Sequence, residues 1–542
     1  MRACRARDGV EKSKGKSKSK SKGKGKGKGK GKGKQARRRR PSRDEIRKRR
    51  ERYLAHRKAL KRRELTDVLS HAAKAAQPNR VSSYASKEEE EAERQRITVA
   101  FIESVRPQLP ALLQALSEID DPRDPKKVDH QLALVLFYGV LCFMFQAASR
   151  REANRELSGP VLVEHLRQFW PELEKLPHHD TVNRVLAKIE VEKIQDLHME
   201  MIRRLVRNKK LDRFLIDNRY PVAIDGTQKL VSKELLSPEW QERTLNKGTE
   251  NEKTQYYVYV LEAALAFANG MTLPLLSEFL NYEQGDTEHD KQDCETRAFK
   301  RLTKRLRSEF PRLSIMLVLD GLYPNGPVFE ICRAYHWQFM IVLQDKSLPA
   351  VWSEFNGLVK LDPDNQATMS WGGRRQVFRW VNDIEHCFGD NGRKHQKVHV
   401  VACTESWDEI DPKTGEQVAK TSRHVWISSE PLTKHNVHER CNLAARHRWN
   451  IEEQNLTEKR QGYRYEHCFS QTWEAMKGYH YLMHLGHALN VLAQYSEALI
   501  EAVRLKGVQP LIRFIRDSLV HPWLDPEKLA KALPPTAQLR LA

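Results

Sequence analysis

Cysteine is scarce in this sequence of 542 residues, and none of the eight cysteines stands in a Cys-x-x-Cys pair. The scatter favours neither a zinc knuckle nor a disulfide framework, and it suits a reducing cytoplasm. Apolar runs of the ~18 residues that a membrane span needs are also lacking. The most apolar stretch, residues 132–148, is interrupted by Tyr138, Gly139 and Gln146 and predicts a core helix. The basic N-terminus has no apolar segment behind it, so we expect no signal peptide and no membrane association.

Excess charge is missing from most of the chain, although the formal net charge is +23. Residues 1–63 hold 30 Lys and Arg against 5 Asp and Glu, so the remaining residues hold 64 against 66. The length allows two or three domains. Any nucleic-acid function of the body must therefore rest on local patches and motifs rather than on its overall charge.

The basic head is a low-complexity segment. Residues 12–34 alternate Lys with Gly or Ser, and four arginines follow at 37–40. Such a segment buries too little apolar surface to offset its ordering entropy, so we expect disorder. It could bind phosphates without reading sequence. An accidental extension, from a short DNA repeat read through upstream of the true start, would give the same pattern.

Helical periodicity dominates residues 97–211. Within it, residues 177–193 predict two short helices with a cap at Asp180 or Thr181. This could be a helix-turn-helix that enters DNA, but helical hairpins are more often packing units, and we favour packing. The acidic residues 88–93 are interpreted as a linker.

From Tyr220 onward the sequence pattern predicts alternating strands and helices. A strong hairpin signal, Asn269-Gly270, joins two of the strands, and the alternation implies an α/β layer with some parallel pairing. Residues 350–428, with five tryptophans, predict a β-rich insertion. We expect strands at 221–227, 255–267, 271–279, 313–319 and 338–343, and helices at 294–308, 327–335, from about 436, and 472–506.

Two aspartates end apolar runs, Asp225 after residues 221–224 and Asp320 after residues 313–319. In an α/β sheet this places a side chain at the carboxyl edge of a strand. Each could instead be a turn residue, since Asp-Gly is a common turn dipeptide. Asp320 is followed by a helix rather than a return strand, which weakens the hairpin alternative.

A third acid, Glu452, lies in a predicted helix without Gly or Pro. On the helical wheel Glu452 lies about 40° from Arg448, and Lys459 lies about 20° from Arg448. Glu453 points about 100° away from Glu452. The alternative is a solvated face with charge pairs. If the three carboxylates converge, their repulsion must be neutralised, and all-oxygen ligands suit Mg²⁺, with Mn²⁺ as a substitute. Two such ions can support phosphodiester displacement.

Together these residues resemble the signature of the DDE transposases of the insertion-sequence-four family. Arg448, Glu452 and Lys459 match its spacing, with Asp225 in Ala-Ile-Asp-Gly-Thr and Asp320 in Leu-Val-Leu-Asp-Gly as the other acids. The resemblance extends over about residues 97–496, and residues 121–125 before an apolar helix resemble the helical domain that often precedes this core. One position departs: the family has Tyr three residues before the Arg, and here it is Ala445.

The resemblance implies an RNase H-like catalytic core interrupted by the β-rich insertion and preceded by a helical domain. It implies cut-and-paste transposition at terminal inverted repeats, by a homodimer on double-stranded DNA in the cytoplasm, associated with the nucleoid. The implied domains are a basic tail (1–63), a linker or helix (64–96), a helical domain (97–215), the first part of the core (216–349), the insertion (350–428), the second part (429–506) and a C-terminal tail (507–542).

The resemblance also implies roles for side chains. Asp225, Asp320 and Glu452 would bind two Mg²⁺ ions and catalyse cleavage, while Arg448 and Lys459 would contact phosphates of the transposon end. Because of Ala445, a hairpin-end intermediate is not assured. Two alternatives stay open, a nuclease of the same fold that hydrolyses without joining and a decayed or domesticated copy that only binds DNA.

Further candidates come from the insertion and the last long helix. Trp371 and Trp380 could stack on an extruded base, although tryptophans in a β-rich unit are more often core. The histidines 480, 484 and 487 share one helical face and could seat a metal ion. With no carboxylate partner evident in the sequence, we expect packing or DNA contact from them.

The charge distribution predicts the effect of truncation. Removing residues 1–63 should weaken non-specific DNA binding and flatten its dependence on salt, because most phosphate neutralisation would be lost, while end-specific cleavage survives. Binding measured over a salt series checks this. Loss of cleavage on truncation would show that the head is more than an appendage.

Overall fold

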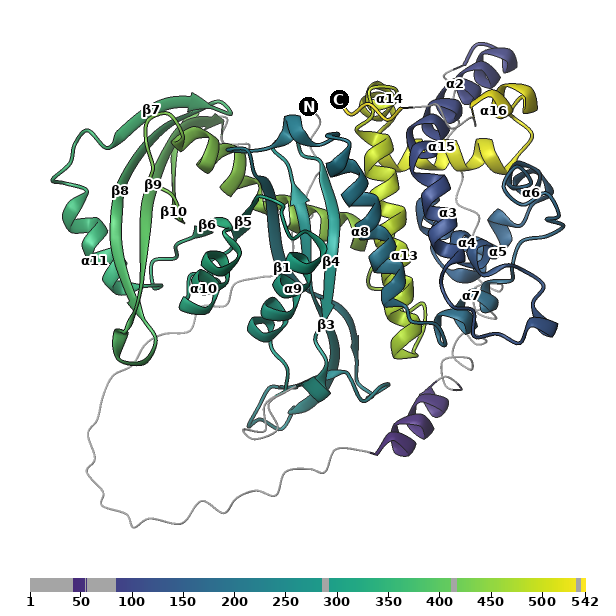
Figure 1. Ribbon diagram of the computed structural model, residues 1–542, viewed down its shortest axis with the longest axis horizontal. Coiled ribbons are helices and arrows are strands. Elements are labelled where there is room, and N and C mark those ends of the chain that lie inside the picture. Colours follow the sequence, from purple (N-terminus) through teal and green to yellow (C-terminus); the bar gives the residue numbers. More distant parts are fainter. Residues whose placement is uncertain (1–41, 54, 56–83, 285–291, 411–416, 533–537) are drawn as a thin grey trace. The chain divides into compact units, whose positions relative to one another are not determined.

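A ten-stranded mixed sheet is the central element of the chain (Figure 1). The computed structural model describes residues 42–53, 55, 84–284, 292–410, 417–532 and 538–542. The strand order is β2-β3-β1-β5-β6-β10-β9-β8-β7, and β4 also pairs with β3. The predicted α/β class is confirmed as a mixed α/β fold with many helices.

The strands from the first half of the sheet form both antiparallel and parallel pairs. β1 pairs antiparallel with β3 and parallel with β5, and β5 pairs parallel with β6. The predicted Asn269-Gly270 turn joins β3 to β4, with Gly270 at a φ of 88° that favours glycine. The strands are β1 (Tyr220–Ser232), β2 (Gln241–Leu245), β3 (Lys253–Ala266), β4 (Thr272–Phe279), β5 (Ile315–Leu319) and β6 (Gln338–Val342).

The insertion is β-rich, as predicted, but it extends the same sheet. Its last strand, β10, pairs antiparallel with β6 from Trp426↔Val342 to Ser428↔Met340. Gly372 and Gly373, both at positive φ, form the two-residue loop between β7 and β8. The elements are α11 (Pro349–Leu358), β7 (Gln366–Trp371), β8 (Arg374–Phe388), β9 (Lys394–Ile410) and β10 (Gln417–Ser428).

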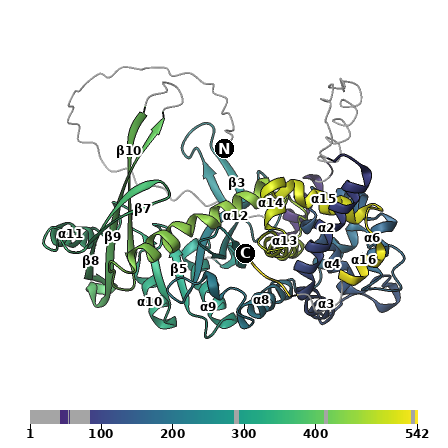
Figure 2. The ribbon, with the colours of Figure 1, turned by 90° about the horizontal axis from the view of Figure 1, so that it is seen from above.

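Helices cover the two faces of the sheet beside β1 and β5, as Figure 2 shows. One face carries α9 (Glu295–Glu309) and α10 (Gly326–Tyr335), close to the predicted helices. The other carries α12 (Trp449–Arg460), which contacts β1, β3 and β4. The long α13 (Trp473–Gln494) packs against β4 as well as against α4 and α8. The sheet is therefore covered on the side of Asp225 by the helix that carries Glu452.

The helical region packs around α4 and α13. The acidic residues 88–93, expected to be a linker or helix, form the first turns of α2, which Ser86 caps. Acidic side chains are favourable there because the helix dipole is positive at its N-terminus. The helices are α2 (Lys87–Val105), α3 (Leu109–Ser117), α4 (Leu132–Met144), α5 (Arg150–Leu157), α6 (Pro160–Leu166), α7 (His179–Leu186) and α8 (Glu192–Arg207).

The helical hairpin formed by α7 and α8 is a packing unit in this structure. Its cap is His178, whose Nδ1 accepts from the N–H of Asp180, rather than Asp180 or Thr181. Val182, Val185 and Leu186 of α7 are buried, and α7 and α8 both contact α13. The apolar faces that periodicity predicted are thus used for the core.

The C-terminal part departs from the expected single helix over 472–506. It breaks after Gln494 into α13 and α14 (Ile500–Lys506), and Ser496 makes a bridge with Leu541 in the break. α15 (Val508–Val520) and α16 (Pro526–Ala532) follow. In the part of the chain that is described, no helix has both the length and the apolarity that a membrane crossing requires.

Residues 43–542 form one compact unit, so the helical region, the sheet and the insertion share a continuous core. The basic tail falls almost wholly outside the described residues; of it, residues 43–53 are helical, and the Lys/Gly repeat and residues 56–63 are not described.

The close contact between α13 and α4 at Gly486 predicts an effect on stability. A Cβ at Gly486 of α13 would lie 3.1 Å from the carbonyl oxygen of Val140 and 3.2 Å from the amide nitrogen of Met144. Backbone cannot yield as a side chain can, so Gly486→Ala should destabilise by about 1–3 kcal/mol despite the higher helix propensity of Ala. Gly357→Ala in α11, with nothing within 4 Å, is the matched control and should be neutral or stabilising. Thermal unfolding checks both, and equal melting temperatures would contradict the tight contact.

Candidate active site

Two aspartates lie at the same level of neighbouring parallel strands. The last β1–β5 pair is Ala223↔Val318, and Asp225 and Asp320 each follow two residues later. Asp320 directly follows β5, and its Oδ1 accepts from the N–H of Leu322 at 2.9 Å, so it shapes the turn as well. Asp225 was expected at the end of a strand. It lies instead inside β1, where it pairs with Glu262 of β3. The turn alternative is therefore wrong for Asp225.

The third acid is carried by a helix that begins later than expected. A π-helical turn (Glu439–Ala444) and a 3₁₀ turn (Ala445–Arg448) precede α12, so Glu452 lies in the first turn of α12. Such π-turns frequently occur at functional sites. Arg448 is buried, and its Nη1 donates to Oε1 of Glu452 at 2.8 Å. Glu453 is exposed, in agreement with the choice of Glu452.

The three carboxylates share one electrostatic environment. Burial raises the pKa of Asp225 to about 7, and repulsion from Glu452 and Asp320 adds to the rise while Arg448 opposes it. A carboxyl whose pKa is shifted this far by burial and by neighbouring acids marks a candidate functional site. The carboxylates are not drawn tightly together: the triad is not among the described groups whose ligand atoms all lie within 4.8 Å of one another.

Lys459 lies on the same side of α12 as Glu452, as the wheel indicated, but it pairs with another carboxylate. Its Nζ pairs with Oε1 of Glu466 at 3.3 Å and lies 5.7 Å from the ring centre of Tyr465. The step of seven residues from Glu452 to Lys459 separates them by about 10 Å along the helix axis, which the wheel does not show. Only Arg448 pairs with Glu452 among the described residues.

The insertion is fastened to the start of α12 by a buried carboxylate. Arg446 donates to Oε1 of Glu405 at 2.6 Å, and Gln376 donates to the same oxygen at 2.6 Å. The guanidinium of Arg446 also lies 5.5 Å from the ring centres of Trp371 and Trp426. Because Glu405 is fully buried, this network fixes where the segment before Glu452 can lie.

The two tryptophans proposed from the sequence to stack on a base differ in their exposure to solvent. Trp371 is partly exposed and held by Arg446, so one face remains a candidate for stacking. Trp380 is only 2% exposed and packs in the core with Ala445, so its ring cannot reach a base in this arrangement. Sequence reasoning did not single out Trp449, which is 58% exposed and borders Arg448. As the first residue of α12, it carried no periodic signal.

A second, buried polar cluster lies beside the triad. The histidines 480, 484 and 487 of α13 do have carboxylate partners, Glu262 of β3 and Glu458 of α12. Burial alone would raise the pKa of Glu458, but His484 and His487 outweigh it and lower the pKa to about 2. Sequence reasoning missed these partners; a lone Glu within the apolar run 260–266 was the available signal.

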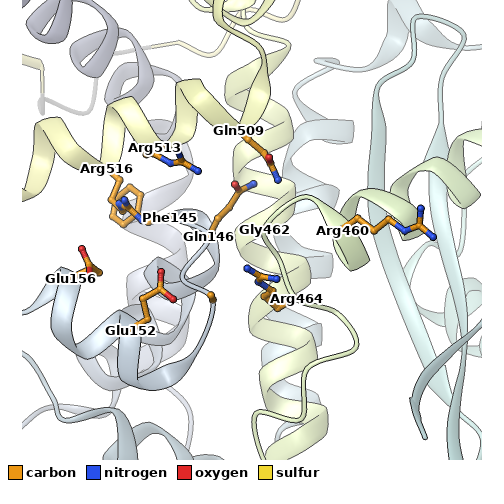
Figure 3. A pocket seen from close by; sticks show the side chains of 11 residues that line it. Phe145, Gln146, Glu152, Glu156, Arg460, Gly462, Arg464, Gln509, Arg513 and Arg516 are labelled. Atoms are coloured by element: carbon orange, nitrogen blue, oxygen red, sulfur yellow. The ribbon is translucent and has the colours of Figure 1, made fainter. Parts of the chain in front are cut away.

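An arginine-rich pocket lies near the other end of α12. Its volume is about 490 Å³, and Figure 3 shows arginines from α12, α15 and the loop after α12 around it. Arg460, Arg464 and Arg513 have no ion-pair partner among the described residues, whereas Arg516 pairs with Asp517. Glu152 and Glu156 also line it, so the four arginines outnumber the acids. Such a pocket attracts anions.

Comparison with known proteins finds a similarity in the helical region of the chain. Residues 113–202, from α3 to α8, match the family model described as "DDE_Tnp_1-associated". No curated protein matches the chain. The matched residues precede all three acids. The match points to a transposase-type family, and hence to a class of enzymes that cleave DNA.

The shifted pKa of Asp225 predicts how stability depends on pH. The ordinary Asp pKa is ~3.9 and the folded value is about 7, so the folded state loses stability as pH rises across this window. Without added Mg²⁺ or Mn²⁺, Asp225→Asn should therefore stabilise the protein progressively from pH 4 to 7, by up to ~4 kcal/mol at pH 8.

Thermal melts at pH 4.5 and 8 measure this difference. Glu453→Gln, an exposed neighbour of Glu452, is the control and should show no such trend. A melting temperature of Asp225→Asn that equals wild type at pH 8 would mean that the carboxyl is not crowded.

Proposed function

We propose that this chain is a DDE transposase of the insertion-sequence-four type that cuts DNA at terminal inverted repeats and joins the ends to a target. The observation that carries the proposal is the electrostatic coupling of Asp225 to Asp320 and Glu452, with Arg448 bound to Glu452, where α12 lies over the neighbouring strands β1 and β5. The family match on the helical region supports it independently, because it covers none of these residues.

The sheet supports an RNase H-like core. Its strand order β4-β3-β1-β5-β6 combines three antiparallel strands with two parallel ones, and helices cover both faces. The β-rich insertion between β6 and α12 lies between the second Asp and the Glu, as the resemblance implies. The first Asp is on β1, the second follows β5, and the Glu is on α12, so the acids approach from three elements.

The donor set fits hard divalent cations. Three carboxylates offer only oxygen, and the crowded Asp225 gains most from a cation because its neighbours are negative. We infer that two Mg²⁺ ions bind, with Mn²⁺ as a substitute. When bound, they would activate the attacking water or 3′-hydroxyl and stabilise the leaving oxygen.

The side chains of the site position the carboxylates and hold the proton that is lost when a cation binds. Asp225, with its pKa near 7, gives up its proton when the cation enters, and Asp320 is oriented by its hydrogen bond to Leu322. Arg448 holds Glu452 at 2.8 Å and limits the repulsion that it exerts on the aspartates. Arg448 thus acts first as a positioning residue, and its contact with a phosphate requires it to exchange this partner.

DNA would lie along α12. The unpaired arginines of the pocket begin at Arg460, eight residues after Glu452, and suit backbone phosphates. Lys459 and Trp371 remain proposed DNA contacts. The exposed Trp449 could supply an aromatic contact near the cleaved end in place of the family's Tyr, since Ala445 is buried. A homodimer that holds two ends is the expected assembly.

The activity is tested with the purified chain, Mn²⁺ and a duplex that carries the inverted repeat flanking its gene. Wild type should cut the end and join a pre-cut end to target DNA. Asp225→Ala should abolish cleavage, with a loss of at least ~10³-fold, while duplex affinity stays within a few-fold, because the carboxylate holds cations rather than DNA.

Glu453→Gln, one residue from Glu452 and exposed, is the matched control and should cleave like wild type. Cleavage by Asp225→Ala at the wild-type rate would overturn the triad. Hydrolysis without joining would favour the nuclease alternative, and binding without cleavage by wild type would favour a decayed copy.

A further inference from the structure

A buried group of four charged side chains, here called the ion group, lies beside the triad. It consists of two carboxylates and two cations from four different elements, Glu262 of β3, Glu458 of α12, Lys229 of β1 and His484 of α13. Glu262 is directly opposite Asp225 in the sheet, so their side chains share one face. Buried ion pairs add little stability over apolar residues of the same size, so packing alone does not account for the ion group.

His484 joins the two carboxylates. Its Nε2 lies 3.4 Å from Oε2 of Glu262 and 3.4 Å from Oε2 of Glu458. Burial alone would lower the pKa of His484, but Glu458 and Glu262 outweigh it and raise the pKa to about 10. The ring is therefore an imidazolium at neutral pH, and one N–H lies between the two oxygens. The other, on Nδ1, donates to Oγ of Ser277 at 3.3 Å.

Lys229 supplies the second cation, and a β-bulge directs its side chain. The pairing of β1 with β3 shifts register at this residue, and bulges beside active sites often redirect a side chain in this way. Its Nζ donates to the carbonyl oxygen of Tyr465 at 3.1 Å and to Nδ1 of His480 at 3.2 Å. The hydroxyl of Tyr465 donates to Oε1 of Glu262 at 2.5 Å. Burial lowers the pKa of Lys229 to about 8, against the opposing effect of Glu262 and Glu458, so the amine stays charged at neutral pH.

Glu458 anchors the second half of α12. Its Oε1 accepts from Nδ1 of His487 at 2.7 Å, in addition to the ion pair with His484. At the start of the helix, Nδ2 of Asn450 donates to the carbonyl oxygen of Phe267 at 3.0 Å. Both anchoring side chains are buried, and Glu452 lies between them on the helix.

We propose that the ion group positions the triad, because it ties the helix that carries Glu452 to the strand that carries Asp225. Lys229 follows Asp225 by four residues on β1, and Glu458 follows Glu452 by six on α12. Apolar packing is not directional, whereas a buried group of balanced charges favours one register between the elements that it joins. The inference rests on the proposed function and deepens it: the members of the ion group are positioning residues, which act through the acids of the triad.

The test unties α12 from the sheet without leaving a net charge. Glu458→Gln combined with His484→Gln removes one charge of each sign and keeps an amide that can bond to His487. The kcat of end cleavage should fall by ~10–10²-fold while KM for the duplex stays within a few-fold, because a displaced acid affects the chemical step rather than DNA binding. The Mn²⁺ concentration that gives half the maximal rate should rise at least ~10-fold.

Glu192→Gln combined with Lys477→Gln is the matched control. This ion pair joins α8 to α13 and lies on none of the elements that carry the acids. Its kcat and its Mn²⁺ dependence should equal those of wild type. If the variant of Glu458 and His484 also matches wild type in both quantities, and only its melting temperature falls, the ion group is merely structural and the inference is overturned.

Glu458→Asp covers the case in which the double variant fails to fold. It keeps every charge and shortens the side chain by one methylene, so it should fold and still raise the Mn²⁺ requirement several-fold. An unchanged Mn²⁺ requirement would overturn the inference.

Mn²⁺ binding to the DNA-free protein, followed by the electron paramagnetic resonance signal of free Mn²⁺, makes the same comparison without cleavage. Weaker binding in the Glu458 variants than in wild type and control supports the positioning role even if wild type does not cut DNA. Cleavage by wild type together with unchanged Mn²⁺ binding in these variants overturns the positioning role and leaves the proposed function standing.

Discussion

Repulsion among carboxylates in poorly solvated surroundings is the constraint on which the site depends. Asp225 sits within a covered sheet, and both its burial and its acidic neighbours work against its ionisation. One cation, Arg448, offsets part of this cost through its bond to Glu452. The fold therefore holds an unfavourable charge arrangement in place, and entry of divalent cations would relieve it. The folded protein tolerates this electrostatic destabilisation only because the surrounding core is extensive.

The helix α12 contributes an acidic side chain to each of two polar clusters. Its residues Glu452 and Glu458 lie about 120° apart on the helix, so one faces the triad and the other the buried histidines. The entry to α12 is fixed by Arg446 on Glu405, and also by Arg440, which donates to Gln338 and Asp217. The insertion therefore contributes to the site by fixing the segment before Glu452, in addition to any contact with DNA.

Local patterns in the sequence predicted most helices and strands, and they singled out three acids whose roles remain predictions. Apolar runs gave the strands β5 and β6, and the Asn269-Gly270 turn was read from two residues. Long-range features were not accessible in the same way. The extension of β1 past Asp225 depends on β3 pairing beside it, and the break after Gln494 depends on Leu541, which returns from the chain end.

Contacts of single side chains with residues distant in the sequence were likewise not predictable from local patterns. The helical wheel placed Arg448 beside Glu452, and the two side chains pair, but a wheel does not show that two turns separate Glu452 from Lys459. The histidines of α13 were recognised without their partners, because Glu262 and Glu458 come from other elements. Residues 177–193, predicted as a helical hairpin, hold α7 and only the first two residues of α8, and α7 packs against α13.

The most direct test of the central claim is a crystal structure of the full chain soaked with Mn²⁺, with data collected at a wavelength where manganese scatters anomalously. The account predicts an anomalous peak within ~2.0–2.5 Å of carboxylate oxygens of Asp225 and Asp320, with Glu452 at or beside it. Manganese bound elsewhere, with these three carboxylates free of it at saturating Mn²⁺, would contradict the account.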